Sequence, residues 1–196
     1  MLLEGSCHCK AVSFRVESGT PYPYQACYCS ICRKTAGGGG YAINLGANAN
    51  TLEVEGGENL SVYNARLYDR GEPDEVPASE AERNFCQLCG SFLWLYSPSH
   101  PDLVHPFASA IDTPLPRPPE RVRLMLDYAA PWCEIPADGN ERLFPSTRKN
   151  PWRSGTAATV FSRGRQRPPP PPKDQLSGRL LPFSRARTGR VLAGEP

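Results

Sequence analysis

The chain has 196 residues, with 22 lysines and arginines against 20 acidic residues and a formal net charge of +2. This length allows one ordinary domain plus an appendage, and such a domain buries a core without disulfides. No apolar run approaches the roughly 20 residues that a transmembrane helix needs, so we expect no membrane partner.

A series of short β-strands is predicted from the N-terminus onward. In AVSFRVES, Val12, Phe14 and Val16 alternate with polar neighbours, which is the period of a half-buried strand. No long helical stripe is present, so the fold class is predicted to be mostly β. Further apolar stretches lie between Gly, Pro and Asn residues: YAINL, TLEVEG, LSVYNARLY, SFLWLYS, DLVHPFA and RVRLMLDY.

Three connecting segments are predicted to be loops. RKTAGGGG carries four consecutive glycines, and TPLPRPPER is a proline-stiffened linker between two strands. DRGEPDEVPASEAE is acidic and contains prolines, which favours an exposed excursion with a short helical turn at SEAE.

The C-terminal segment differs in kind from the rest. Residues 147–196 hold eleven basic and two acidic residues, a net charge of +9, whereas residues 1–146 carry −7 and all eight cysteines. RQRPPPPPK favours polyproline II, and little apolar surface surrounds it. We therefore predict a folded domain over 1–146 and a disordered, basic, proline-rich tail over 147–196.

The first residues, MLLEGSCHC, reach an acid and cysteines before a signal-peptide core could form. We therefore expect a cytoplasmic protein. In a reducing compartment, clustered cysteines are typical of metal sites or redox centres rather than of disulfides.

Two cysteine pairs predict a closed metal site. A structural zinc needs four soft ligands, and Cys7 with Cys9 and Cys86 with Cys89 each supply half of such a set. Gly90 follows the second pair, where a tight metal-binding turn favours glycine. This zinc would join the first strand to a distant one.

The third group, Cys27, Cys29 and Cys32, predicts an open site, because three protein ligands plus a vacant position are typical of catalytic zinc. Spacing alone leaves open a site that mixes Cys7 or Cys9 with this trio. It also leaves open a second structural site that a histidine completes: His8, His100 or His105.

The chemistry of the trio favours a thiol substrate. Three thiolates leave a divalent ion with a net charge of about −1, which weakens its power to acidify water and disfavours a hydrolase. Soft donors suit a fourth sulfur ligand, which loses its proton on binding and can attack a carbon electrophile.

Several other residues have two interpretations each. Arg33 and Lys34 follow the trio and can pair with a substrate carboxylate or stay solvated. Cys133 is predicted to be a small core residue, with a redox role as the alternative. Trp94 and Trp132 are predicted to lie in the core, with a stacking role as the alternative.

The motifs GSCHCKAVSF, CYCSICRK and FCQLCGSFL resemble, in order and type, those of the glutathione-dependent formaldehyde-activating enzyme family, which also includes centromere protein V. Weaker similarity continues in TLEVEGGENLSVY, FASAIDTP and APWCEIP, so the resemblance runs from about Leu3 to Pro136. The chain departs from the family at Lys10, where glycine is usual, in the length between Cys32 and Cys86, and in the tail.

The resemblance implies an Mss4-like, mostly β fold that binds two Zn²⁺ ions. It also implies a carbon–sulfur lyase of the S-(hydroxymethyl)glutathione synthase type, which condenses glutathione with formaldehyde. The implied ligands are Cys7, Cys9, Cys86 and Cys89 for the structural ion, and Cys27, Cys29 and Cys32 for the catalytic ion.

The leading hypothesis is thus a zinc enzyme acting on the thiol adduct of a small aldehyde or other carbon electrophile. The alternative is a non-enzymatic zinc module that binds a protein partner. Nucleic acid is not expected as a partner, because the predicted folded part is acidic. The sequence leaves the oligomeric state open.

Overall fold

The computed structural model describes residues 1–19, 21, 24–68, 75–135, 139 and 141–145. All of them belong to one unit of the chain, Met1–Gly164. The predicted tail, 147–196, and part of the acidic excursion, 69–74, lie outside the described residues. None of the helices that the structure describes is long and apolar enough to cross a lipid bilayer.

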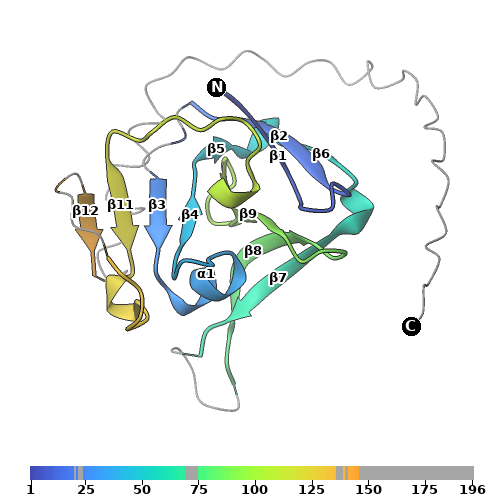
Figure 1. Ribbon diagram of the computed structural model, residues 1–196. Coiled ribbons are helices and arrows are strands. Elements are labelled where there is room, and N and C mark those ends of the chain that lie inside the picture. The colour runs from blue at the N-terminus through green and yellow to red at the C-terminus, as the bar shows by residue number, and fades with distance from the viewer. Residues whose placement is uncertain (20, 22–23, 69–74, 136–138, 140, 146–196) are drawn as a thin grey trace, which may run out of the picture. The chain divides into compact units, whose positions relative to one another are not determined.

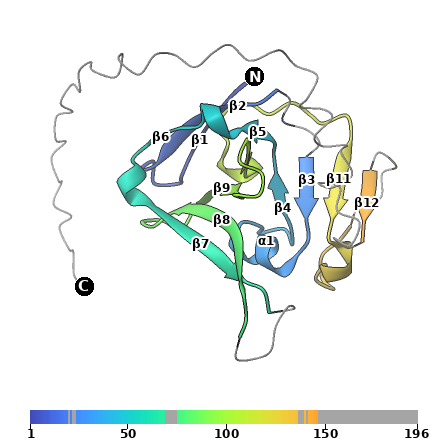
Figure 2. The ribbon, with the colours of Figure 1, turned by 180° about the vertical axis from the view of Figure 1, so that it is seen from behind.

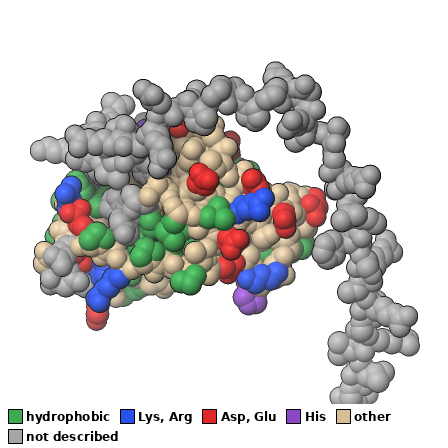
Figure 3. All heavy atoms as spheres, turned by 90° about the horizontal axis from the view of Figure 1, so that it is seen from above, with side chains coloured by type: hydrophobic (Ala, Val, Ile, Leu, Met, Phe, Trp, Pro, Cys, Tyr) green, Lys and Arg blue, Asp and Glu red, His purple; other side chains and the backbone are tan. Residues whose placement is uncertain are grey.

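The described residues form three sheets and one α-helix (Figures 1 and 2), which confirms the mostly β prediction. Figure 3 shows one face, on which acidic and basic side chains are interspersed and hydrophobic side chains lie beside them. The first sheet is antiparallel and consists of β1 (Leu2–Ser6), β2 (Ser13–Glu17) and β6 (Glu53–Glu55), in the order β1-β2-β6.

The second sheet is also antiparallel. It consists, in spatial order, of β5 (Ala47–Asn48), β10 (Leu103–Pro106), β9 (Phe92–Tyr96), β8 (Ala78–Cys86) and β7 (Leu60–Arg66). In the third sheet β11 is parallel to both neighbours, and the order is β12 (Glu141–Phe144), β11 (Arg121–Leu124), β3 (Tyr24–Cys27) and β4 (Ala42–Asn44).

Short helices connect these strands. The α-helix α1 spans Ser30–Thr35 and follows β3. Four 3₁₀ turns complete the regular structure: η1 (Ala49–Thr51), η2 (Gly57–Asn59), η3 (Ala108–Ala110) and η4 (Leu126–Tyr128).

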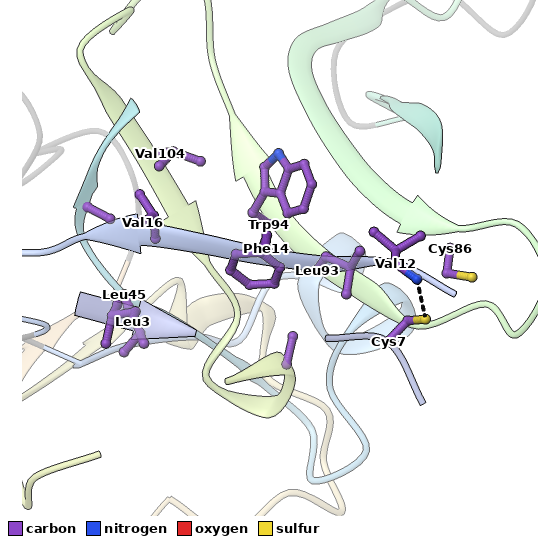
Figure 4. Packing of buried hydrophobic residues seen from close by; sticks show 12 residues of the cluster. Leu3, Cys7, Val12, Phe14, Val16, Leu45, Cys86, Leu93, Trp94 and Val104 are labelled. Carbon is purple, nitrogen blue, oxygen red and sulfur yellow. Dashed lines mark hydrogen bonds between the residues drawn. The ribbon is translucent and has the colours of Figure 1, made fainter. Parts of the chain in front are cut away.

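The main core lies between the first and second sheets. Phe14 of β2 and Trp94 of β9 meet edge to face with ring centroids 5.1 Å apart, surrounded by aliphatic side chains (Figure 4). Gly5 pairs with Phe14 across β1 and β2, and a Cβ atom on Gly5 would lie 2.4 Å from the Phe14 ring. The first sheet therefore packs closely against this aromatic pair.

A second core lies beside the third sheet and includes two cysteines of the trio, Cys27 and Cys32. The strand β9 contributes to both cores. Trp94 belongs to the main core, whereas Phe92 and Leu95 pack against the second core. A register shift in the β8–β9 pairing, which skips Leu93, accompanies this arrangement, and β9 lies between the two cores.

Every strand predicted from an apolar stretch is present, in β2, β4, β6, β7, β9, β10 and β11. The helical turn expected at SEAE is wrong, because residues 79–82 belong to β8, in which Glu82 pairs with Asn64 of β7 and with Tyr96 of β9. Trp94 is buried as predicted. Trp132, with 66% of its surface exposed, is not a core residue.

Candidate metal centres

Four cysteines come together where the turn after β1 meets the turn after β8. The Sγ atoms of Cys7 and Cys9 are 3.5 Å apart, and those of Cys9 and Cys86 are 3.8 Å apart. Cys89 completes the group, and the four sulfur atoms all lie within 4.8 Å of one another. Cys7 and Cys86 are buried, whereas Cys9 and Cys89 are exposed.

The first turn places Cys7 and Cys9 through backbone hydrogen bonds. The Lys10 N–H donates to the carbonyl oxygen of Cys7 at 3.0 Å, and the Val12 N–H donates to Cys7 Sγ at 3.3 Å (Figure 4). Lys10 has φ +62°, in the left-handed region that favours glycine.

The second turn repeats this design. The Gly90 N–H donates to the carbonyl oxygen of Cys86 at 2.8 Å, and Gly90 has φ +73°. Each cysteine pair is thus followed directly by a residue in the left-handed region. This is the turn that the glycine after Cys89 predicts.

The donor set of this group fits a tetrahedral zinc ion. Zinc–sulfur bonds of about 2.3 Å place the sulfur atoms of a tetrahedron about 3.8 Å apart. The measured separations of 3.5 and 3.8 Å are close to this edge. A hydrogen bond with Ser91 Oγ also lowers the pKa of Cys89 to about 5, which favours the thiolate that a metal requires.

The trio forms a second group at the junction of β3 and α1. Cys27 ends β3, Cys29 is the N-cap of α1, and Cys32 lies in the first turn of the helix. The Cys32 N–H donates to Cys29 Sγ at 3.3 Å. The three sulfur atoms lie within 4.8 Å of one another. The short helix therefore brings Cys32 back to the two cysteines that precede it.

The trio favours thiolate chemistry because its thiols contact one another. Hydrogen bonds from Cys27 and then Cys32 lower the pKa of Cys29 to about 2. The same contact with Cys29, followed by that with Cys32, raises the pKa of Cys27. One thiolate is thus stabilised by two neighbouring S–H groups, whose protons a bound metal would displace.

In the part of the chain that the structure describes, no fourth His, Cys, Asp or Glu side chain joins the trio. His105 is buried elsewhere, and its Nδ1–H donates to the carbonyl oxygen of Leu45 at 2.9 Å. The backbone of His8 contacts Ser91, beside the other cysteine group. The structure also assigns Cys7 and Cys9 to the group of four, not to a site mixed with the trio.

Cys133 is not the core residue that the sequence suggested. It is only partly buried, and its Sγ–H donates to the carbonyl oxygen of Gly39 at 3.4 Å. Gly40, with φ +90°, lies so close that a Cβ atom there would be 2.5 Å from Cys133 Sγ. Part of the glycine run is therefore required by the close packing of Cys133.

Three cationic side chains lie near the trio in sequence or in space. Lys34 is exposed, whereas the Nε atom of Arg33 is buried without a hydrogen-bond partner among the described residues. Sequence reasoning missed Arg83 of β8, which is buried and interacts electrostatically with Cys32. Arg83 directly follows the predicted acidic excursion and gave no signal, because its burial depends on strand pairing.

The family model described as glutathione-dependent formaldehyde-activating enzyme matches residues 2–124. A Halomonas elongata protein, provisionally named as such an enzyme, is 58% identical over 144 residues, which cover 74% of this chain and 87% of that protein. A Rhodobacter sphaeroides protein of known crystal structure is 27% identical with a TM-score of 0.44, covering 58% of this chain and 92% of that one.

Proposed function

Because the chain belongs to the glutathione-dependent formaldehyde-activating enzyme family, we propose that it is a zinc-dependent carbon–sulfur lyase. Its substrate is the adduct of a thiol, glutathione by family membership, with a small aldehyde such as formaldehyde. The observation that carries the proposal is the trio of Cys27, Cys29 and Cys32, which no fourth ligating side chain joins among the described residues.

The two cysteine groups have different roles in this proposal. Cys7, Cys9, Cys86 and Cys89 hold a structural zinc ion that links the turn after β1 to the turn after β8. The trio holds a catalytic zinc ion, which when bound would take the substrate sulfur as a fourth thiolate ligand. Burial of Cys27 and Cys32 supports this role, because electrostatic interactions with a bound cation are stronger in a site from which water is excluded.

The reaction is an addition in one direction and a cleavage in the other. The thiol loses its proton, and its sulfur forms a bond to the carbonyl carbon of the aldehyde. The π electrons of the carbonyl pass to oxygen, and the resulting alkoxide takes a proton from solvent. No electrons are gained or lost overall. Cys29, at the entrance of α1 and only partly buried, lies on the side of the trio nearest to solvent.

We extend the proposal to the organisation and location of the chain. The catalytic domain spans 1–146, and catalysis does not require residues 147–196. The protein works in the cytoplasm. Support for a reducing compartment comes from the eight cysteines, all of which are free thiols.

The test is exchange NMR with ¹³C-formaldehyde and glutathione, which measures interconversion of free and thiol-bound formaldehyde at equilibrium. The wild type is expected to accelerate this exchange and to carry two zinc ions per chain by mass spectrometry. Cys29→Ser should abolish the acceleration while the structural zinc stays bound. Cys133→Ser is the matched control, since Cys133 belongs to neither group.

The opposite result would support a non-enzymatic zinc module. In that case the zinc-loaded wild type would not accelerate exchange for glutathione or for small thiols, and Cys29→Ser would behave as the wild type does.

A further inference from the structure

Arg83 is a buried cation, and part of its guanidinium has no hydrogen-bond partner among the described residues. It lies on β8, which pairs with β7 on one side and β9 on the other, and only 6% of its surface is exposed. Two of its guanidinium nitrogens, Nε and Nη1, are buried and have no hydrogen-bond partner among the described residues. Burying a charge and its donors in this way is unfavourable unless a partner arrives.

The side chain of Arg83 lies on the face of the sheet that covers the trio. Arg83 is in register with Leu95 of β9, and residues opposite each other on paired strands share a face. Leu95 packs against the second core, which contains Cys27 and Cys32. The next residue pair, Asn84 with Trp94, belongs to the other face, where Trp94 joins the main core.

The positive charge of Arg83 also interacts with the trio. The guanidinium lies within electrostatic range of Cys32. A divalent ion with three thiolate ligands has a net charge of about −1, so Arg83 brings this part of the structure near neutrality. The thiolates are then occupied by the metal, and the N–H donors of Arg83 remain available to another acceptor.

We propose that Arg83 binds an anionic oxygen of the molecule that reacts at the trio, an inference that rests on the proposed function. The guanidinium is planar and offers parallel donors, which match an oxygen anion better than an ammonium group does. Because it is buried and already in place, it stabilises such an anion without reorganising.

Two sources can supply this oxygen. One is a carboxylate of the thiol substrate, such as glutathione carries. The other is the alkoxide that forms when the thiolate sulfur bonds to the carbonyl carbon and the π electron pair moves to oxygen. The alkoxide then takes a proton from solvent, so the step is balanced without a further reactant.

The experiment compares Arg83→Met, Arg83→Lys and Arg15→Met in the full-length, zinc-loaded protein. Arg15 forms an exposed ion pair with Glu53 on the first sheet and is the matched control. Zinc content should stay at the wild-type level in all three. Exchange of formaldehyde with thiol should fall at least tenfold in Arg83→Met, recover in part in Arg83→Lys, and stay unchanged in Arg15→Met.

The choice of thiol separates the two sources. If the oxygen is a carboxylate, Arg83→Met raises KM for 3-mercaptopropionate and spares the neutral 3-mercapto-1-propanol. If it is the alkoxide, Arg83→Met lowers kcat for both thiols and leaves KM unchanged. The proposal is overturned if activity is unaffected, or if it falls only in proportion to zinc lost from the trio, which would make Arg83 a counter-charge for the metal.

A direct measurement keeps this proposal separate from the proposed function. The Nε–H resonance of Arg83 in ¹⁵N-labelled wild type, assigned by its loss in Arg83→Lys, should shift on adding propionate and not on adding the neutral propionamide. A shift in a protein that does not accelerate the exchange of formaldehyde with thiol would contradict the proposed function and support the anion site. Absence of a shift would overturn the anion site whatever the activity.

Discussion

Lys10 holds a backbone conformation that suits glycine better than lysine. Its φ of +62° lies in the left-handed region, which explains why glycine is the residue expected here from family resemblance. In return, Lys10 Nζ donates to Ser6 Oγ at 2.7 Å and lies 3.4 Å from Asp112 Oδ1. These contacts are exposed and contribute little to stability.

The effect of replacing Lys10 on the free energy of unfolding therefore depends on the new residue. We expect Lys10→Gly to be more stable than Lys10→Ala by about 1 kcal/mol, because both lose the exposed ion pair and only glycine relieves the left-handed strain. Denaturant unfolding at saturating zinc measures this difference. Equal stability of the two variants would contradict the strain argument.

His105 makes the fold sensitive to acid. Burial lowers its pKa to about 4, and its neutral ring donates to the carbonyl oxygen of Leu45. The unfolded chain binds the proton at a pKa of about 6.5, so the stabilisation is complete above that pH and is lost as pH falls toward 4.

We expect the wild type to lose roughly 3 kcal/mol more unfolding free energy than His105→Gln between pH 7 and pH 4. Protonation of the cysteines affects both proteins equally and cancels in the comparison. Chemical unfolding at several pH values gives both curves. Parallel curves would show that His105 titrates normally in the folded protein.

Some residues of the site could be predicted from the sequence and others could not. Spacing predicted a grouping of seven cysteines as four and three but left a mixed site open, and the sulfur atoms in the structure have the predicted grouping. Their roles stay predictions. The role of Arg83 was beyond reach, because its burial depends on which strands pair. Trp132 is exposed in a turn outside the strands, and its residue type alone did not indicate this.

At the level of elements, short apolar stretches identified most of the described strands, and the strands for which no such stretch was recognised were missed. Residues 25–27 of β3 are buried in succession, because this strand lies between β11 and β4. In β8, pairing on both sides overrides the helical propensity of SEAE. The helix α1 spans only six residues, too short for a helical stripe.

The group of four links two turns that are distant in sequence. We therefore expect loss of its metal to reduce the stability of the fold more than loss of the metal at the trio. Cys86→Ser removes a proposed ligand that links β8 to the turn after β1, and we expect it to lower unfolding free energy by several kcal/mol, on the order of a structural zinc contribution. Cys29→Ser is expected to cost less, because Cys29 caps a short, partly exposed helix. Thermal unfolding of both variants tests this order, and the reverse order would contradict the assigned roles.

A buried ion pair joins β11 to β12. Arg123 binds Glu141 and the hydroxyl of Tyr28, and the side chains of Arg123 and Glu141 are each 4% exposed. Glu141→Gln should destabilise the fold by about 3–5 kcal/mol, because it leaves the guanidinium buried without its counter-charge. The double variant Arg123→Met with Glu141→Gln should recover much of that loss in urea unfolding. Additive losses would show that the two charges act independently.

At the scale of the whole molecule, the ion pair indicates that the folding unit extends beyond the region that the family model matches. The match ends at residue 124, whereas Glu141 of β12 lies beyond it. We expect a chain of residues 1–146 to keep both zinc ions, thermal stability and thiol exchange. A chain of residues 1–124 should fail to fold, since it retains Arg123 and loses its partner. Loss of exchange in the longer chain would give residues 147–196 a catalytic role.

The alternation of β9 between two cores has a further consequence. Cys7 and Cys86 are part of the main core, and Cys27 and Cys32 are part of the second. Each cysteine group is therefore packed into a different hydrophobic core, and β9 lies between the two cores. Under the proposed function, substitutions around the trio can change substrate preference without disturbing the packing around the group of four, so that few of them are needed for a new specificity.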